Sequence, residues 1–314
     1  MIHSMFRALV DHGHQVTVWL SKDGPLRAEY GLDGVRVIPF QSGVDFATQA
    51  SRADVLVSHL ENVAATAGYG RRYRVPVVSV CHNTFDPTFG DIATGAVPFA
   101  VYNSLWMQDA ARVWFARAGV EAPESIVVRP PVYAADYRTD PGDAITLVNL
   151  NQEKGGDLFW RIAERMPERR FLGVLGAYGT QVRPPRRLAN LEIIPHVPGD
   201  RMRDRVYART AVLLVPSEYE SWGRVGVEAM ASGIPVIAHP TPGLVESLGA
   251  AGIFASRDDL DAYVTALRDV LEPAAYELAS ARARRRSAEL DPAPDLAHWV
   301  AAVEEWAARN RTSR

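Results

Sequence analysis

Short apolar runs alternate with longer amphipathic stretches along most of the chain. Runs rich in β-branched and aromatic residues predict buried strands, whereas stretches with helical spacing of apolar positions, such as 105–117, predict helices. Strands that alternate with helices form parallel sheets, so the pattern predicts the α/β class. In the first half of the chain the predicted strands are 15–20, 35–40, 54–58, 75–81, 99–102 and 126–128.

The alternation is interrupted once, near the middle of the chain. Segments 129–131 and 136–142 carry proline and polar residues typical of a linker, and a new apolar strand begins at Ile145. We therefore predict two α/β units with a cleft between them. A last amphipathic helix carries Trp299 and Trp306, which fit either core packing or the anchoring of this helix. The predicted divisions are 1–139, 140–292 and 293–314.

The composition is that of a large enzyme with ordinary surface charge. The chain has 314 residues, 47% of them hydrophobic, and a formal net charge of −3, so it can build two cores and shows no charge typical of a nucleic-acid binder. No apolar run reaches membrane-spanning length. With Cys81 as its single cysteine, the chain can form no intrachain disulfide and no thiolate metal cluster. No signal peptide opens the sequence, and we expect a cytoplasmic location.

The most informative segment follows a predicted buried strand at 211–215. Pro216 and Ser217 end this strand, and a helix is predicted from about Arg224 until Gly233, where glycine is typical of a helix end. Glu228 is the lone charge inside this apolar helix. A buried carboxylate requires hydrogen-bond donors, which a ligand diol could supply.

A second carboxylate, Glu220, stands in the loop before the same helix. Sugars offer adjacent hydroxyl groups to such carboxylates, and the first N–H groups of a helix attract phosphate. The segment therefore predicts a site for a sugar and a phosphate. The alternative interpretation gives Glu220 a favourable interaction with the helix dipole and makes Glu228 a structural hydrogen-bond acceptor.

A lysine marks a second phosphate-binding loop. The basic residues are almost all arginine, and the two lysines are Lys22, in a predicted surface turn, and Lys154. Lys154 precedes Gly155 and Gly156, between an apolar strand and a predicted helix. Glycines let a backbone approach phosphate closely, and lysine serves such sites as a point charge. This pattern predicts that Lys154 binds a diphosphate.

Glu220-x7-Glu228, followed by Ala-Met-Ala-Ser-Gly-Ile-Pro-Val-Ile-Ala, resembles the retaining glycosyltransferases of the GT4 family. The resemblance implies the GT-B fold, with two Rossmann-like domains facing across a cleft and a C-terminal helix that crosses back to the first. It places Glu220 against the transferred sugar, Glu228 against the nucleotide ribose and Lys154 against the donor diphosphate. The other donor-binding residues that it implies are Ser221, Trp222, Gly223, Arg224, Val225 and His196.

Histidines follow two of the predicted strands in the first half. His82 stands where GT4 members carry a histidine that faces the transferred sugar, so the resemblance assigns it a catalytic role beside Glu220. His59 sits similarly, and a hydrogen bond within the local fold is its usual role. His196 lies where the family's base-binding segment begins.

The chain departs from the family pattern in two places. The family usually has an arginine five positions before Lys154, where this chain has Asn149, and our hypothesis is that Arg224 replaces the missing charge. The first strand and its glycine-rich turn are also missing, because the sequence opens with the family's first helix. In a doubly wound sheet this strand is central, so we expect an unpaired inner edge and a true start upstream of Met1.

Three other motifs have simpler explanations. The glycines of 173–179 lack dinucleotide-binding spacing and indicate a flexible strand end. The acidic segment 258–261 is predicted to begin a helix rather than bind metal. The arginines of 282–286 could make a weak peripheral contact with anionic lipid, although one face of an exposed helix is their commoner role.

The resemblance implies a glycosyltransferase of the EC 2.4 type that moves a sugar from a nucleotide-sugar donor to an unidentified acceptor. It implies retention at the anomeric carbon, and neither a metal nor another cofactor. A GT-B nucleotide-sugar epimerase is one alternative. The other is a non-catalytic or impaired nucleotide-sugar-binding protein, which the missing strand and Asn149 favour.

Overall fold

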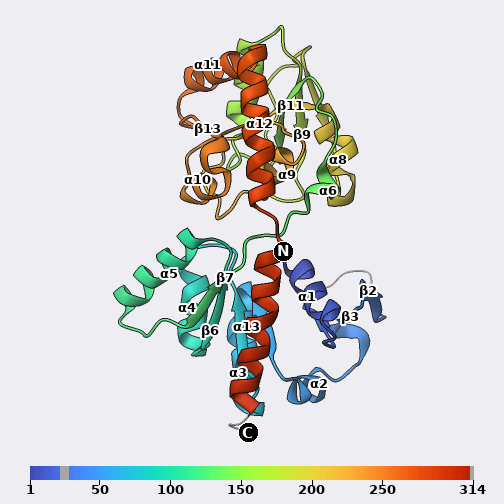
Figure 1. Ribbon diagram of the computed structural model, residues 1–314, viewed down its shortest axis with the longest axis vertical. Coiled ribbons are helices and arrows are strands. Elements are labelled where there is room, and N and C mark those ends of the chain that lie inside the picture. Colours follow the sequence, from blue (N-terminus) through green and yellow to red (C-terminus); the bar gives the residue numbers. More distant parts are fainter. Residues whose placement is uncertain (22–27, 312–314) are drawn as a thin grey trace. The chain divides into compact units, whose positions relative to one another are not determined.

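The computed structural model describes residues 1–21 and 28–311 (Figure 1), and Lys22 lies outside this range. The chain divides into two compact units: Met1–Pro131 together with Pro292–Arg314, and Val132–Asp291. Every pairing between strands in the described residues is parallel except that of β2 with β3. The α/β class expected from the alternating pattern is therefore correct.

The second unit is built on one parallel sheet with the strand order β10-β9-β8-β11-β12-β13. Its first strand in sequence, β8, lies beside its fourth, β11, and later strands extend outward on both sides. In this doubly wound order, ligands bind beyond the carboxyl ends of the strands where the order reverses, which here is between β8 and β11. The strands are β8 (Ala144–Val148), β9 (Phe171–Val174), β10 (Leu191–Ile194), β11 (Thr210–Val215), β12 (Val236–Ala238) and β13 (Gly252–Phe254).

Helices cover both faces of this sheet. Successive residues of β11 point to opposite faces, so Leu213 packs in one core with Val227 and Leu244, whereas Leu214 packs in another with Phe159 and other apolar residues. Strands buried on both faces read as continuous apolar runs, as β11 does. The helices are α6 (Ala134–Tyr137), α7 (Gly156–Arg165), α8 (Met202–Arg205), α9 (Arg224–Met230), α10 (Pro242–Leu248), α11 (Leu260–Val270) and α12 (Pro273–Glu289).

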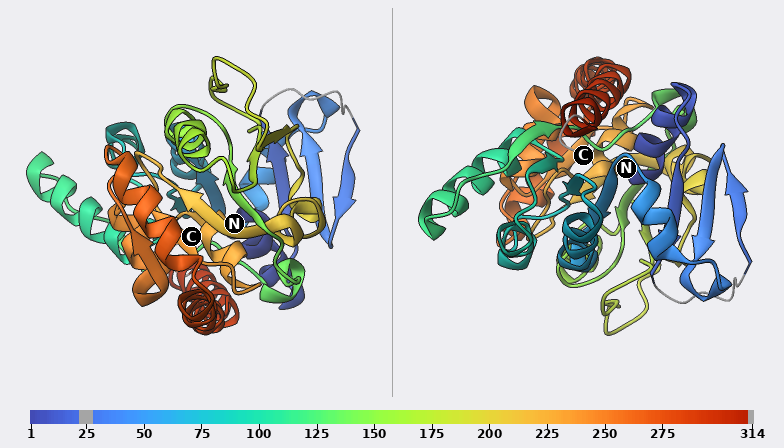
Figure 2. Two further views of the ribbon diagram at one scale, coloured as in Figure 1. Left: turned by 90° about the horizontal axis from the view of Figure 1, so that it is seen from above. Right: turned by 90° about the horizontal axis from the view of Figure 1, so that it is seen from below.

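The first unit contains two separate sheets, β4-β5-β6-β7 and β1-β3-β2. The strands of the smaller sheet are blue in Figure 2 and lie at one side of the unit. In the described residues β1 and β4 each have a single hydrogen-bonded neighbour, so each is an edge strand of its sheet. The strands are β1 (Thr17–Leu20), β2 (Tyr30–Leu32), β3 (Val35–Pro39), β4 (Leu56–His59), β5 (Val77–Val80), β6 (Phe99–Tyr102) and β7 (Glu124–Val127).

The sequence pattern does not predict β2. This strand is only three residues long and exposed throughout, and it pairs antiparallel with β3. Without buried side chains it has no alternation from which a strand could be predicted. The remaining helices of the first unit are α1 (Ile2–Asp11), α2 (Phe46–Arg52), α3 (Val63–Tyr73), α4 (Asp86–Gly95), α5 (Leu105–Ala118) and α13 (Ala293–Arg311).

The last helix, α13, is part of the first unit, where it contacts α1 and β7 (Figure 1). Trp299 is fully buried, and its indole Nε1–H donates to the carbonyl of Met5 over 3.0 Å. The ring of Trp306 lies 5.0 Å from that of Phe99. Both tryptophans therefore fill the core and anchor the helix, which are the two roles that the sequence allowed.

The boundary between the units differs from the expected one at 139/140. The second unit begins at Val132, because the predicted linker packs against it. Tyr137 is buried in its core, and the Tyr137 carbonyl accepts a hydrogen bond from Ser232 Oγ over 2.9 Å. The composition of this segment is typical of a linker, so helix α6 could not be predicted. Its apolar side chains pack against residues that are distant in the sequence.

Replacing Trp299 by alanine should lower the free energy of unfolding of the first unit by about 3–5 kcal/mol. The change empties a large part of the core and leaves the Met5 carbonyl without its donor. Urea unfolding followed by circular dichroism measures the effect, and His298→Ala, at an exposed position on the same helix, is the control. Equal stabilities of the two variants would show that α13 does not hold this unit together.

Candidate functional site

Two loops meet where the strand order of the second unit reverses. One follows β8 and carries Lys154, and the other follows β11 and carries Glu220. The amide of Glu218 donates to the carbonyl of Glu153 over 2.8 Å. Gly155 has a φ of +80°, and a Cβ there would lie 2.6 Å from Pro216 Cγ, so glycine permits this approach.

The meeting of these loops brings together Lys154, predicted to bind the diphosphate, and Glu220, predicted to bind the sugar. The Lys154 ammonium donates to Glu220 Oε1, and Ser217 Oγ donates to the same oxygen over 3.0 Å. The two charged side chains are 18% and 17% exposed, so each is largely enclosed but still open to a ligand. The sequence predicted both residues, but not that they would form an ion pair.

Arg257 stabilises this pair of loops, and the sequence analysis missed it. Its guanidinium donates to the carbonyls of Gln152 and Glu153 over 3.2 and 3.3 Å, and lies 3.3 Å from the Glu218 carboxylate. Its own backbone is held by His239 Nδ1. The signal was weak, because Arg257 stands in the loop after β13, more than a hundred residues from the carbonyls that it binds.

Helix α9 begins beside Glu220. Gly223 precedes it with a φ of +76°, and a Cβ there would lie 2.3 Å from Leu244 Cδ2. No side-chain hydrogen bond caps this helix among the described residues. The amide of Gly226 donates to the Gly223 carbonyl over 3.0 Å, so the amides left for water or a ligand include those of Arg224 and Val225. Ser221 and Trp222 are buried, whereas Val225 is partly buried. Trp222 packs in the core, and its Nε1–H has no partner among the described residues.

Glu228 is buried, but it does not depend on a ligand for hydrogen bonds. Tyr207, in the 3-10 turn Tyr207–Arg209, donates its hydroxyl to Glu228 Oε2 over 2.6 Å. Arg224 Nε lies 2.8 Å from Glu228 Oε1. A ribose diol is therefore not required to satisfy this acid, because the protein supplies both donors. Burial raises the pKa of Glu228, and Arg224 and Tyr207 partly offset this shift.

Arg224 is engaged in the same cluster. Its Nη2 donates to the hydroxyl of Tyr137 over 2.7 Å while its Nε pairs with Glu228. The arginine side chain is 44% exposed, so one side of the cluster faces solvent. In this structure its charge compensates Glu228, and two of its guanidinium nitrogens are bound to protein acceptors.

Asn149 has a structural role in the place of the family's arginine. Its φ is +68°, and its Oδ1 accepts a hydrogen bond from Gln181 Nε2 over 3.0 Å. A Cβ at Gly176 would lie 1.9 Å from the same Oδ1. The segment after β9, expected to be a flexible strand end, is therefore fastened to Asn149 and depends on glycine for this close packing.

His82 and His59 lie together in the first unit, where His82 follows β5 and His59 is the last residue of β4. Their rings are 5.3 Å apart and nearly perpendicular. Burial, and the neighbouring His59, lower the pKa of His82 to about 4, and burial also lowers the pKa of His59. His59 Nδ1 is buried without a hydrogen-bond partner among the described residues. Both imidazoles are therefore neutral near pH 7.

His196 and the acidic segment 258–261 do not contact the Lys154–Glu220 pair in the described residues. His196 is exposed after β10, the edge strand, which β9 and β8 separate from β11. Asp259 accepts from the amide of Ala262 and so caps α11, as its sequence context indicated. The described residues contain no group of three acidic, histidine or cysteine side chains placed to hold a metal ion.

The arginine run is divided between surface and interior. Arg282, Arg284 and Arg285 are exposed on α12, whereas Arg286 donates to the carbonyls of Glu246 and Ser247. None of the helices in the described part of the chain combines the length and apolar character needed to span a bilayer.

Two family models match the sequence. Residues 1–139 match the model described as Glycosyltransferase Family 4, and residues 143–273 match the model described as Glycosyl transferases group 1. Together these matches include most of both units, and residues 274–314 lie outside them.

Curated relatives include D-inositol 3-phosphate glycosyltransferases. The protein from Geodermatophilus obscurus is 31% identical over 243 residues, which are 65% of this chain and 53% of the relative. The protein from Mycobacterium marinum is 26% identical over 277 residues, which are 74% of this chain and 59% of the relative. The chain thus spans little more than half the length of these relatives.

Solved structures show the same fold at low sequence identity. Sucrose-phosphate synthase from Thermosynechococcus elongatus has a TM-score of 0.79 at 16% identity, with 98% of this chain and 93% of that chain covered. Anabaena HepE in complex with UDP and glucose has a TM-score of 0.74 at 16% identity, with 97% and 95% covered. These structures show that the two α/β units have the GT-B fold. The two family models, which together match residues 1–139 and 143–273, show that the chain belongs to the glycosyltransferases of family 4 and group 1.

Proposed function

We propose that this protein transfers a sugar from a nucleotide-sugar donor to an acceptor, with retention at the anomeric carbon and without a metal ion. The observation that carries the proposal is the Lys154–Glu220 pair at the reversal of strand order in the second unit. A cation for the leaving diphosphate and a carboxylate for the sugar are held there side by side. The family and the curated glycosyltransferases among its relatives support the same reaction class.

The donor diphosphate binds Lys154 in this proposal. Phosphate carries more charge than a carboxylate, and it competes with Glu220 for the ammonium. Glu220 is then released to accept hydrogen bonds from the hydroxyl groups of the sugar. Charge that develops on the leaving diphosphate is stabilised by Lys154 and by the uncapped amides of α9, and such preorganised donors usually supply the largest catalytic contribution.

The nucleotide ribose binds at Glu228 through an exchange of partners. Arg224 is the partly exposed partner of Glu228, whereas Tyr207 is fully buried. A ribose hydroxyl therefore replaces Arg224 more readily than Tyr207. The displaced Arg224 guanidinium is then free to approach the diphosphate. In this way Glu228 binds the ribose, and Arg224 supplies the positive charge that is missing at Asn149.

The acceptor loses its proton to the departing phosphate on the same face of the sugar. The new glycosidic bond forms as the bond from the anomeric carbon to the phosphate oxygen breaks, and configuration is retained. Glu220 orients the sugar. The role that the family resemblance assigns to His82, whose imidazole is neutral, is that of a hydrogen-bonding group rather than a charge. The complex of HepE with UDP and glucose supports a nucleotide sugar as donor for this chain, although the donor base stays open.

Transfer is tested by incubating the protein with UDP-, GDP- and ADP-glucose and candidate polyol and sugar-phosphate acceptors. We expect nucleoside diphosphate release that depends on an acceptor, an α-linked product from an α-linked donor by NMR, and no loss of rate with EDTA. Donor binding without acceptor-dependent release would favour the non-catalytic alternative. Loss of rate in EDTA, restored by Mg²⁺, would contradict metal independence.

Lys154→Ala should lower kcat by about 10²–10³-fold, because it removes a preorganised cation from the leaving group. Glu220→Gln should lower kcat with a smaller effect on donor binding, since its contact is with the sugar. Steady-state kinetics and calorimetric titration of the nucleoside diphosphate separate the two effects. Wild-type kinetics in both variants would contradict the proposal that Lys154 and Glu220 bind the donor.

Arg257→Ala should weaken donor binding and lower kcat/KM by about tenfold, although Arg257 itself contacts no substrate. Its loss frees two carbonyls of the loop that positions Lys154, and small misplacement of such a group is costly. Arg268→Ala, at an exposed position on α11, is the matched control. If Arg257→Lys restores activity while Arg257→Ala does not, the positioning role is supported, and equal activity of all variants contradicts it.

A further inference from the structure

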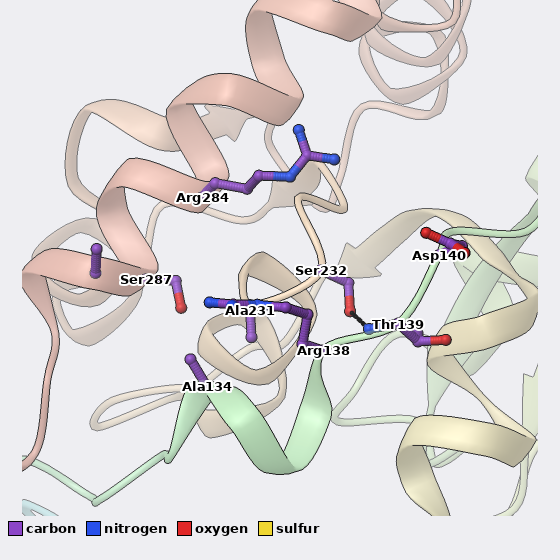
Figure 3. Close-up of a pocket in the computed structure, with 9 residues that line it drawn as sticks. Ala134, Arg138, Thr139, Asp140, Ala231, Ser232, Arg284 and Ser287 are labelled. Carbon is purple, nitrogen blue, oxygen red and sulfur yellow. Dashed lines mark hydrogen bonds between the residues drawn. The ribbon is translucent and has the colours of Figure 1, made fainter.

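A cavity of about 460 Å³ lies in the second unit at the C-terminal end of α9 (Figure 3). Its volume is within the range of about 300–1,000 Å³ that is usual for small-molecule sites. Its polar lining residues come from the segment after α6, from the end of α9 and from α12. They are Arg138, Thr139, Asp140, Ser232, Arg284 and Ser287.

Two arginines on this cavity have no partner of opposite charge. Neither Arg138 nor Arg284 forms an ion pair or a side-chain hydrogen bond with any of the described residues, and both are exposed. In Figure 3, Arg284 extends over the cavity from α12, and Arg138 lies on another side with its guanidinium directed toward Ser287 in this view. By contrast, Arg224, Arg257 and Arg286 are all bound to protein acceptors.

The wall that carries Arg138 is held in place. Ser232 Oγ accepts from the amide of Thr139 over 3.0 Å and donates to the Tyr137 carbonyl over 2.9 Å. These bonds fasten the backbone on both sides of Arg138 to the end of α9. An arginine on a fixed backbone loses less freedom when it binds an anion, which favours binding.

The rest of the lining suits a ligand with both phosphate and hydroxyl groups. The Ser287 hydroxyl lines the same cavity as Arg138 and can donate to phosphate oxygens. Asp140 has no charge partner among the described residues and can accept hydrogen bonds from ligand hydroxyls. Alanines at 134, 231 and 288 leave the space open.

The C-terminal end of α9 carries a partial negative charge, which would oppose an anion nearby. The carbonyls of Glu228, Ala229 and Met230 are occupied, however, because they accept hydrogen bonds from the amides of 231–234. The two arginines therefore dominate the local charge.

We propose that this cavity binds a small hydroxylated phosphate monoester, with the phosphate between Arg138 and Arg284 and the hydroxyls toward Asp140. The site is distinct from the Lys154–Glu220 pair, which lies near the N-terminal end of α9. It does not depend on the proposed transferase reaction.

Glycerol 3-phosphate, titrated calorimetrically into the whole protein at low salt, is the probe. Arg138→Gln and Arg284→Gln should each weaken its binding about tenfold or more, because each removes a charge-assisted hydrogen bond. Arg282→Gln makes the same charge change on α12 outside the cavity, so it should leave binding unchanged. Lys154→Ala should also leave it unchanged, since phosphate held at the donor site would be lost in that variant.

Ala288→Leu, which narrows the cavity without changing charge, should weaken binding as well. Inorganic phosphate should bind more weakly than glycerol 3-phosphate, because it has no carbon-bound hydroxyls for Asp140. Binding that is lost in Lys154→Ala but kept in Arg138→Gln would overturn the site. Affinity of the wild type for phosphatidylglycerol vesicles without any response to glycerol 3-phosphate would assign the arginines to a lipid surface instead.

Discussion

The buried carboxylate of Glu228 is the constraint on which the second unit depends most. A charge with 6% of its surface exposed is tolerated only if donors surround it, and removing one partner of such a pair typically costs about 3–5 kcal/mol. Tyr207 and Arg224 supply those donors, and Tyr137 binds Arg224 in turn. One acid thus holds together α9, the 3-10 turn before β11 and the segment that begins the unit.

The strand order determines where the chemistry can occur. Because β8 and β11 are neighbours with oppositely directed crossovers, the loops at their carboxyl ends meet beyond the sheet. Lys154 and Glu220 come from these two loops, 66 residues apart in sequence, and pair with each other. A fold with another strand order would separate them, so their pairing follows from topology as much as from the motif.

Both charged pairs share one property, which is that each is complete without a ligand. Lys154 is paired with Glu220, and Arg224 with Glu228. The two cations are thereby kept in position in the absence of donor. In the proposed reaction the donor exchanges these partners. Glu220 occupies in advance the place of the phosphate at Lys154, and Arg224 occupies that of the ribose at Glu228.

The sequence predicted the elements and loops whose signal is local. Each of these signals is contained in a short segment. Examples are the strand β11 followed by α9, the glycines beside Lys154, and the tryptophans of α13. The partners of Glu228 could not be predicted, because Tyr207 lies 21 residues from it and shares no motif. For the same reason α6 was taken as a linker and Arg257 was missed, since both depend on contacts between distant segments.

The central claim is that donor binding exchanges the partners of Lys154 and Glu228. A crystal structure of the protein with its bound nucleoside diphosphate tests this most directly. The account predicts that Lys154 Nζ leaves Glu220 for a phosphate oxygen and that a ribose hydroxyl replaces Arg224 at Glu228. A diphosphate bound elsewhere in the second unit, with both ion pairs intact, would contradict it.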